Sequence, residues 1–124
     1  MEPPIKRIKL SQPAKNQLIY LKGVTKIDNW NILCRWAFCR SLAEASSPTT
    51  IVSNENSNVE MDWRTFAGET GDILIIALKQ RCHNDGLGTD GETLAAQFRL
   101  HLHRGIGYLA AEIKSLSELI SLAL

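Results

Sequence analysis

The sequence predicts a mainly α-helical protein in which a short N-terminal strand precedes a bundle of about four helices. Apolar residues recur at helical spacings of three and four in several segments, whereas strand-like alternation is confined to two short ones. The chain has 124 residues, 44% of them apolar, which suits one domain that buries about two thirds of its unfolded surface. We therefore expect a single domain, 1–124, made of a basic part (1–45), a flexible loop (46–58) and a helical part (59–124).

Residues 5–11 are expected to form the strand, because their apolar and polar side chains partly alternate. Ser11 is suited to cap the following helix, since its hydroxyl can accept a hydrogen bond from a free amide of the first turn. Pro13 is tolerated in that turn, where its missing N–H would have no partner. The helix should cover residues 14–22 and end at Gly23, because glycine readily adopts the left-handed conformation that follows a helix.

A second helix is predicted from about residue 29 to residue 45, with Asp28 or Asn29 as its N-cap. Its apolar residues leave almost no polar face. They are Trp30, Leu33, Cys34, Trp36, Ala37, Phe38, Leu42 and Ala43. A helix that is apolar nearly all round is buried. We expect it to be surrounded by the rest of the chain and by a second copy, because a domain of this size has few layers with which to cover both sides.

Residues 46–58 are predicted to be a flexible loop, because they are rich in Ser, Thr, Asn and Pro and show no period. Beyond them Val59, Met61 and Trp63 alternate with charged residues. This pattern fits either a short strand or a loop that lies over the core.

The apolar run at 73–78 fits a helix or a strand by its pattern alone. A helix is favoured because residues 79–81 continue without a breaker and place cations in a last turn. Residues 84–91 are predicted to be a turn. Thr89 or Asp90 can then cap a final helix.

The final helix is expected to run toward Gly105 and Gly107 and to continue as an amphipathic C-terminal helix. Its apolar residues there repeat at intervals of four, three, four and three, as on the seam of a coiled coil. They are Leu109, Ile113, Leu116, Ile120 and Ala123. The seam is short for an independent coiled coil, so we expect it to pack on its own core or against another subunit.

The strongest functional signal is the uneven distribution of charge. The first forty residues contain eight Lys and Arg residues against Glu2 and Asp28, whereas residues 41–98 contain nine acids and three basic residues. The net charge of +1 conceals this asymmetry. Neutralisation of phosphates by Lys and Arg is the main source of non-specific affinity for nucleic acid. The N-terminal part is therefore predicted to contact double-stranded DNA.

The candidate DNA-binding residues fall mostly within the predicted strand and helices. They are Lys6, Arg7, Lys9, Lys15, Lys22, Lys26 and Arg35. Arg35 has apolar neighbours and is expected either to pair with an acid or to direct its guanidinium at a phosphate. Trp30 is expected either to add a stacking or phosphate contact or to belong to the core. The alternative is that these charges form only a solvated face or a loose N-terminal tail.

No pattern indicates catalysis, a metal or a cofactor. His101 and His103 are two residues apart and point about 200° away from each other on a helix. We expect His103 to bond to the backbone and His101 to lie in solvent. Cys34, Cys39 and Cys82 lack the spacing of a zinc or redox site, so we expect them to be small buried residues.

The start of the chain shows no secretory signal, and no segment approaches the roughly 20 apolar residues that span a bilayer. We expect a cytoplasmic protein that does not contact a membrane.

Several stretches resemble one known family as a set. They are RIKLS at 7–11, GVT at 23–25, NWNILCRWAFCRSL at 29–42, FAGE at 66–69 and AAQFRLHLHRGIGYLA at 95–110. The chain thereby resembles DndE, the small component of the bacterial DNA phosphorothioation machinery, which replaces a non-bridging phosphate oxygen with sulfur.

The resemblance implies a mainly helical tetramer that binds DNA through surface lysines, prefers nicked duplex and works beside the ATPase-like DndD and the reductase-like DndC. It extends a DNA-contact role to Lys9, Lys15, Lys22 and Arg35, which lie within or beside the matching stretches. The sequence departs from the family pattern at 26–30, KIDNW, where a tighter connection containing a proline is expected.

The strand-helix-helix opening also looks like a ribbon-helix-helix repressor, in which paired strands from two subunits enter the major groove. In that alternative Lys6, Lys9 and Ser11 face bases or phosphates, and residues 59–124 have no explanation. A DNA-nicking enzyme and a protein-protein adaptor are further alternatives. We favour a DndE-like accessory protein that binds DNA and has no reaction of its own.

Overall fold

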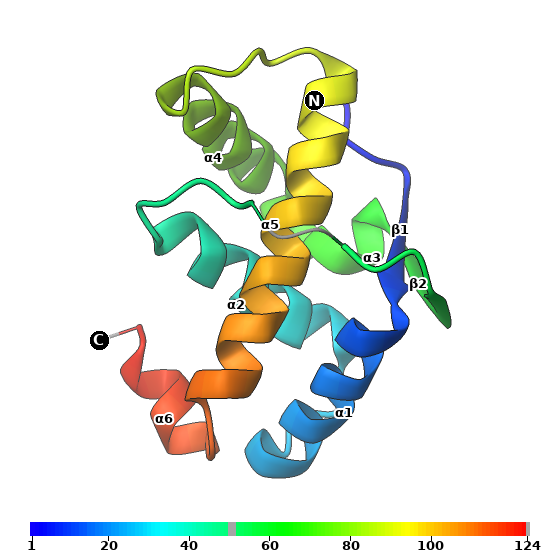
Figure 1. Ribbon diagram of the computed structural model, residues 1–124, viewed down its shortest axis with the longest axis vertical. Coiled ribbons are helices and arrows are strands. Elements are labelled where there is room, and N and C mark those ends of the chain that lie inside the picture. Colours follow the sequence, from blue (N-terminus) through cyan, green and yellow to red (C-terminus); the bar gives the residue numbers. More distant parts are fainter. Residues whose placement is uncertain (50–51, 124) are drawn as a thin grey trace.

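A long central helix, α5 (Gly91–Glu112), organises the structure (Figure 1). The computed structural model describes residues 1–49 and 52–123. The other elements follow one another along the chain. They are β1 (Arg7–Ser11), α1 (Gln12–Thr25), α2 (Trp30–Ala43), β2 (Asn56–Asp62), α3 (Trp63–Ala67), the 3-10 turn η1 (Gly68–Thr70), α4 (Gly71–Asn84) and α6 (Leu116–Ser121). The predicted fold class, mainly helical with a short N-terminal strand, is confirmed.

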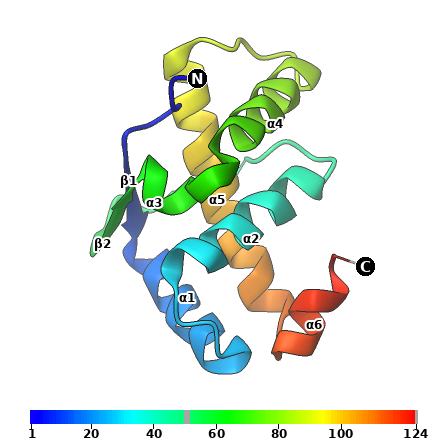
Figure 2. The same ribbon diagram turned by 180° about the vertical axis from the view of Figure 1, so that it is seen from behind.

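Helices α2 and α5 cross at close range, and α2 covers α5 when the molecule is seen from behind (Figure 2). Gly105 makes the approach possible, because a Cβ at this position would overlap the carbonyl group of Ala37. Helix backbones come this close only where a side chain is missing at the crossing. The contact fixes the frame on which the other elements pack.

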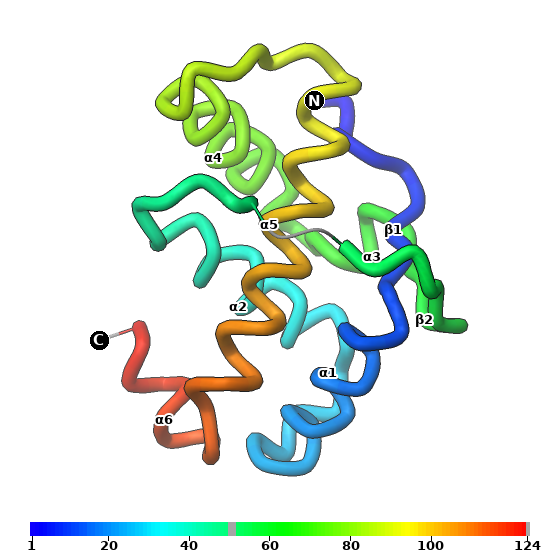
Figure 3. Tube along the Cα trace, viewed as in Figure 1, coloured from blue at the N-terminus to red at the C-terminus, as the bar shows by residue number. Residues whose placement is uncertain are grey.

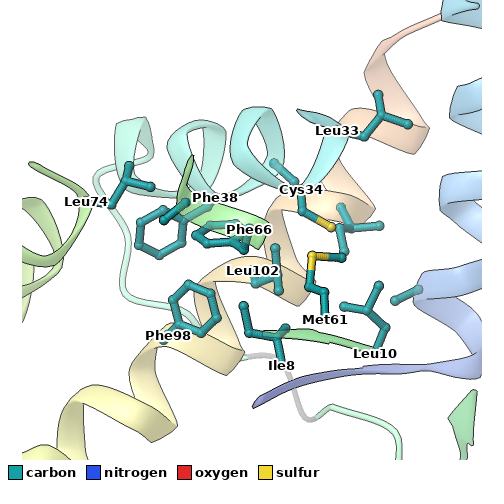
Figure 4. Packing of buried hydrophobic residues seen from close by; sticks show 14 of the residues in the cluster. Ile8, Leu10, Leu33, Cys34, Phe38, Met61, Phe66, Leu74, Phe98 and Leu102 are labelled. Carbon is teal, nitrogen blue, oxygen red and sulfur yellow. The ribbon is translucent and has the colours of Figure 1, made fainter. Parts of the chain in front are cut away.

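An aromatic cluster fills the space between α2, α3 and α5 (Figure 4). The ring centroids of Phe38 and Phe98 are 5.1 Å apart, and the Phe66 centroid lies 5.2 Å from that of Phe98 and 6.0 Å from that of Phe38. All three side chains are fully buried, and the two contacts of Phe66 are edge-to-face, which adds to the free energy of burial. The apolar side of the strands, including Ile8 and Met61, packs against the same core.

Strands β1 and β2 form a two-stranded antiparallel sheet, which we call the β ribbon, at the edge of the molecule (Figure 3). Arg7 is paired with Asp62, Ile8 with Met61 and Lys9 with Glu60. The alternating pattern of residues 59–63 fitted either a strand or a loop, and the structure shows a strand, β2. The predicted flexible loop, 46–58, is too long at its C-terminal end, because residues 56–58 already belong to β2. Residues 50 and 51 of that loop lie outside the described part of the chain.

Helix α1 begins as predicted but ends later. The Ser11 hydroxyl accepts a hydrogen bond from the amide of Ala14, and Pro13 lies in the first turn. The expected stop at Gly23 is wrong, because the helix continues to Thr25. Lys26 takes the left-handed position instead, with a φ of 63°. The Thr25 hydroxyl, which donates a hydrogen bond to the carbonyl of Leu21, helps to extend the last turn.

The C-terminal part differs most from its prediction. Helix α5 starts after the Asp90 cap, as expected, but it ends at Glu112, and the chain turns before α6 begins. The predicted continuous seam is therefore wrong. Ile113 is buried, whereas Leu116 and Ile120 are exposed. The Ser115 hydroxyl caps α6 by accepting from the amide of Glu118, so a local capping signal overrides the apolar period.

Candidate nucleic-acid interface

Three lysines of the N-terminal part line up along helix α1, and we call them the lysine stripe: Lys15, Lys22 and Lys26. Lys15 and Lys22 are seven residues apart, which places them within about 20° of each other around the helix. Lys26 directly follows the last helical residue, so the stripe spans about 16 Å along the helix axis. Lys15 and Lys22 thus lie on one side of a rigid helix, and Lys26 lies at its C-terminal end.

The two helical lysines of the stripe are held by neutral partners. Lys15 Nζ donates a hydrogen bond to the side-chain oxygen of Asn58 on β2 at 2.6 Å. Lys22 Nζ lies 4.2 Å from the ring centroid of Trp30, a cation–π contact. Among residues 1–49 and 52–123, no carboxylate forms an ion pair with any lysine of the stripe. Their positive charge is therefore not neutralised by the protein.

A hollow of about 350 Å³ lies beside the stripe, between α1, the start of α2 and β2. Its lining consists of Lys15, Trp30, Asn58, Val59 and Glu60. Trp30 is the first residue of α2 and is half-buried, so it both packs on the core and borders this hollow. The core interpretation of Trp30 is thus confirmed in part, and its contact with nucleic acid stays a prediction.

The candidate cations of β1 and Lys6, the residue before it, have different surroundings. Lys6, Arg7 and Lys9 are exposed, but Arg7 forms an ion pair with Glu60 on β2, with 3.0 Å between Nη2 and Oε1. Lys9 is directly opposite Glu60 in the strand register, and Asp62 is opposite Arg7. Opposed side chains in an antiparallel pair lie on one face of the sheet and interact. The positive charge of β1 is therefore partly neutralised by β2.

The second edge of β1 is held by helix α5. Arg99 Nη1 donates a hydrogen bond to the carbonyl of Lys9 at 2.7 Å, and the amide of Ser11 donates to His103 Nε2 at 3.2 Å. A ribbon-helix-helix repressor needs this strand to pair with the same strand of a second subunit. Here β1 pairs with β2 of its own chain, and α5 side chains occupy the other edge, so the geometry disfavours that alternative.

Arg35 is separated from the lysine stripe by its contacts. Its Nη1 donates to the carbonyl of Phe66, at the end of α3, at 2.7 Å. Neither predicted partner, an acid or a phosphate, is needed to hold this half-buried side chain. The rest of Arg35 borders an apolar hollow that also includes Trp36 and Ile73. Arg35 therefore belongs to a different surface from Lys15 and Lys22.

The histidines of α5 are structural. His103 bonds to the backbone as predicted, with Nδ1 2.9 Å from the carbonyl of Arg99. Its Nε2 accepts from Ser11, which assigns the proton to Nδ1. The expectation that His101 lies in solvent is wrong, because it is fully buried, with Nδ1 2.8 Å from the Ser41 hydroxyl. Burial lowers the pKa of both histidines to about 4.

Two of the three cysteines are buried as predicted, but Cys39 is exposed. Burial raises the pKa of the Cys34 thiol to about 12, so this sulfur stays protonated. Cys39 lies on the outer face of α2, where it lines the hollow next to Trp36. The nearly unbroken apolar pattern of α2 gave no sign that this face is uncovered.

Sequence reasoning missed two arginines that complete the C-terminal end of α2. Arg104 on α5 is buried and donates to the hydroxyl and the carbonyl of Ser41, at 2.9 and 2.8 Å. Arg81 on α4 donates to the carbonyl of Leu42 at 3.0 Å. The last carbonyls of a helix lack partners within it, and cations are favoured there by the helix dipole. These two arginines therefore stabilise the frame.

Neither a metal cluster nor a membrane segment is present in the described part of the chain. No group of three or more His, Cys, Asp or Glu side chains within 1–49 and 52–123 is arranged to hold a metal ion. None of the helices in the same residues has the length and apolar character needed to cross a bilayer.

The comparison with known families gives one match that covers most of the chain. The family of the DNA sulphur modification protein DndE matches residues 7–117. A comparison with curated proteins finds no match.

Two crystal structures of DndE proteins are similar to this one. DndE from Escherichia coli B7A, involved in DNA phosphorothioation modification, has a TM-score of 0.66 and 29% identity, over 85% of this chain and 96% of that one. A DndE mutant with two glycines changed to lysine, involved in DNA phosphorothioation, has a TM-score of 0.62 and 25% identity, over 85% of this chain and 98% of that one. The helical frame, the N-terminal strand and the match over residues 7–117 together establish that this chain belongs to the DndE family of the DNA phosphorothioation system.

Proposed function

We propose that the protein is a DNA-binding accessory component of the phosphorothioation complex and that the lysine stripe of α1 contacts the phosphate backbone. The observation that carries this proposal is the absence of any carboxylate paired with Lys15, Lys22 or Lys26 among residues 1–49 and 52–123. Lysines that the protein does not neutralise are free to release counterions from DNA, which is the main source of backbone affinity.

The dimensions of the stripe fit one strand of a duplex. Its length of about 16 Å corresponds to about five phosphates at the 3.4 Å axial spacing of a strand. The exposed residues Lys6 and Lys9 extend the contact from α1 to the β ribbon, and Arg7 contributes less because it is paired with Glu60. Arg35 would reach DNA only from the neighbouring surface near α3.

The shape of this surface supports the proposed preference for nicked DNA. The basic residues occupy two elements, α1 and the β ribbon, between which the chain changes direction (Figure 3). In this proposal the duplex bends to contact both elements, and bending costs elastic energy. A nick interrupts one strand, lowers that cost and lets the duplex follow the surface.

In this proposal the protein has no reaction of its own. It holds the backbone near a strand break in the cytoplasm, while DndC-type and DndD-type proteins of the same system carry out sulfur transfer. Membership of the phosphorothioation system supports these partners. The alternative of a nicking enzyme makes a different prediction, namely that the pure protein converts supercoiled plasmid to the open form.

Fluorescence anisotropy with nicked, intact and single-stranded DNA of one sequence, over a range of salt concentrations, tests the proposal. The variant for comparison is Lys15→Gln, Lys22→Gln and Lys26→Asn, because asparagine tolerates the left-handed position of Lys26. We expect the tightest binding to nicked duplex and a steep salt dependence that becomes shallower in the variant. Salt-independent binding, or no binding, would contradict a backbone contact, and plasmid cleavage would favour the nicking enzyme.

We also propose that the protein forms a homo-oligomer, the tetramer that the family resemblance implies, through the outer face of α2. Two hollows of about 420 and 410 Å³ lie along this face and share Trp36 and Cys39. Ile73 of α4 lines one of these hollows, Ile76 follows it one turn along the same helix, and the two side chains are 69% and 53% exposed. Contiguous exposed apolar surface of this kind is typical of subunit contacts.

Light scattering coupled to size-exclusion chromatography tests this assembly. Changing Ile73 and Ile76 together to Glu should lower the molar mass of the particle, because a charge would be buried in the contact. Leu87→Glu is the matched control, since Leu87 is exposed in the turn after α4. An unchanged mass in the double variant would contradict this interface.

A further inference from the structure

We propose that the hollow beside Trp30 binds one unpaired nucleobase at the strand break, with the indole as the stacking surface. The inference rests on the proposed function and adds to it a base-binding position that backbone contacts alone do not provide. Its elements are Trp30 on α2, Lys15 on α1 and Asn58 on β2, which three separate segments of the chain bring together.

The position of Trp30 is unusual for a core tryptophan. It occupies the first turn of α2, stays half-buried, and has a lysine ammonium 4.2 Å from its ring centroid. The other two tryptophans differ: Trp63 is 9% exposed within the aromatic core, and Trp36 lines the apolar hollow on the outer face of α2. Of the three, only Trp30 is in contact with the lysine stripe.

The lining of the hollow matches the chemistry of a base. The indole and Val59 offer apolar contact for the faces of a ring, and an aromatic side chain stacks on any base because every base has a π face. The Asn58 amide can both donate and accept hydrogen bonds at the edge of a base. Lys15 already bonds to Asn58, so the amide is held in place beside an ammonium that can contact the adjoining phosphate.

The charges around the hollow favour nucleic acid. Lys15 and Lys22 contribute two positive charges, and Glu60 is the acid in the lining. The Glu60 carboxylate accepts hydrogen bonds from Nε and Nη2 of Arg7 at 3.1 and 3.0 Å, so its negative charge is balanced from outside the hollow. A phosphate next to a bound base would therefore meet two lysines and no unpaired acid of the lining.

The occupant must be unpaired. A base within a duplex is stacked on both faces and cannot lie against an indole without leaving the helix, which costs free energy. At a nick, the terminal base has lost the covalent restraint on one side, so it opens more easily. The hollow would thereby distinguish a broken strand from a continuous one at the same phosphate contacts.

The test uses the full chain with three short DNAs of one sequence: an intact duplex, a nicked duplex, and a nicked duplex with one unpaired 2-aminopurine at the nick. Trp30→Ala and Trp30→Phe are compared with the wild type, and Ile19→Ala is the control, since Ile19 is an exposed apolar residue of α1 outside the hollow. Anisotropy gives affinity, and quenching of 2-aminopurine reports stacking.

We expect Trp30→Ala to lose about tenfold more affinity for the DNA with the unpaired base than for the intact duplex, where only the freed Lys22 side chain is felt. Quenching should disappear in Trp30→Ala and persist in Trp30→Phe, which keeps an aromatic face. Equal losses for all three DNAs, or quenching that survives in Trp30→Ala, would overturn the inference while the proposed function stands. If the wild type shows no salt-dependent binding to any of the DNAs, the proposed function and this inference both fail.

Discussion

The lysine stripe of α1 and the basic residues of β1 come from the same run of sequence but differ in what neutralises them. Lys15 and Lys22 contact a neutral amide and an indole, whereas Arg7 is paired with Glu60, which is also opposite Lys9. A count of charges along the sequence gives both groups equal weight. The fold separates them, because β2 places Glu60 and Asp62 opposite Lys9 and Arg7. Glu60 also lines the hollow beside Lys15, but its ion pair is with Arg7.

The difference arises from the residue period of each element. The exposed side chains of β1 and β2 lie on the same face of the β ribbon. Charged residues of the two strands are therefore paired directly with each other. On α1, lysines seven residues apart return to the same side of the helix, and that side faces Asn58 and Trp30. We therefore expect backbone affinity to reside mainly in α1, with the ribbon in a supporting role.

The largest effect is expected from disturbing the crossing of α2 and α5, because the lysine stripe and the β ribbon both depend on this frame. Gly105→Ala would place a Cβ against the carbonyl of Ala37 and force α2 away from α5. We expect a loss of about 4 kcal/mol or more in the free energy of unfolding, which chemical denaturation would measure. Both regions would then lose DNA binding together.

Gly107→Ala is the matched control in the same helix. Its nearest neighbour is the side-chain nitrogen of Gln17, 4.0 Å from the added Cβ, so there is room for the methyl group. Alanine is the better helix former, and stability should be unchanged or slightly higher. If Gly105→Ala unfolded at the same denaturant concentration as Gly107→Ala, the close crossing of α2 and α5 would be contradicted.

Neutralising each region in turn tests the comparison directly. Each phosphate contact contributes about 0.9 to the slope of log affinity against log salt. The variant that neutralises the lysine stripe should therefore lower the slope by nearly three, whereas changing Lys6, Arg7 and Lys9 to Gln should lower it by about one, because the acids of β2 already offset part of their charge. Equal changes in slope would mean that the ion pairing of the ribbon has no effect on DNA binding.

The stability of the junction between β1 and α1, where Ser11 bonds to His103, should depend on pH. His103 accepts the Ser11 amide, and its folded-state pKa of about 4 lies below the ordinary value of 6.5 because it is buried. The unfolded chain therefore binds protons first as the pH falls below 6.5, and stability should fall between pH 6.5 and 4 by up to about 1.4 kcal/mol per pH unit for each buried histidine. His101 adds a second contribution with the same sign.

Urea unfolding at several pH values measures this loss, and amide exchange of Ser11 by NMR locates it. His103→Gln should make the pH dependence shallower, and the exposed His83→Gln is the control. If His103→Gln had the same pH dependence as the wild type, protonation of His103 would not be what weakens the junction between β1 and α1.

The sequence predicted the parts of the fold that depend on local signals. The Ser11 and Asp90 caps and the apolar stretch of α2 all predicted elements that are present. The errors at Gly23 and at the C-terminal seam share a cause. In both places a nearby polar residue, Thr25 or Ser115, sets where the helix ends or begins, and periodicity does not contain that information.

The candidate site was predicted only as a list of cations. The helical period sufficed to align Lys15 with Lys22. The residues that make the charges of α1 and β1 different are Asn58, which bonds to Lys15, and Glu60, which pairs with Arg7. Both belong to β2, whose long-range pairing with β1 the sequence does not reveal. Burial is equally non-local: His101 and Cys39 have opposite exposures to those expected, because tertiary packing decides which face of an apolar helix is covered.

The smallest expected effect comes from removing the negative charge of Glu60, which is paired with β1. If the acid of β2 is what weakens the ribbon, Glu60→Gln should release Arg7 and Lys9 and make β1 resemble α1. We expect the salt slope to become steeper by about 0.9, equivalent to one additional phosphate contact, with a severalfold gain in affinity at low salt. The cost in stability should be small, about 0.2–1 kcal/mol, because the Arg7–Glu60 pair is exposed.

Glu92→Gln changes the net charge by the same amount and separates this local effect from a general one. Glu92 is exposed at the start of α5 and forms no ion pair within the described residues. If both variants bound DNA more tightly by the same factor, the gain would reflect net charge alone. A gain in Glu60→Gln that disappears when Arg7 and Lys9 are also changed to Gln would instead show that the acid acts through these two cations, because it then has nothing left to neutralise.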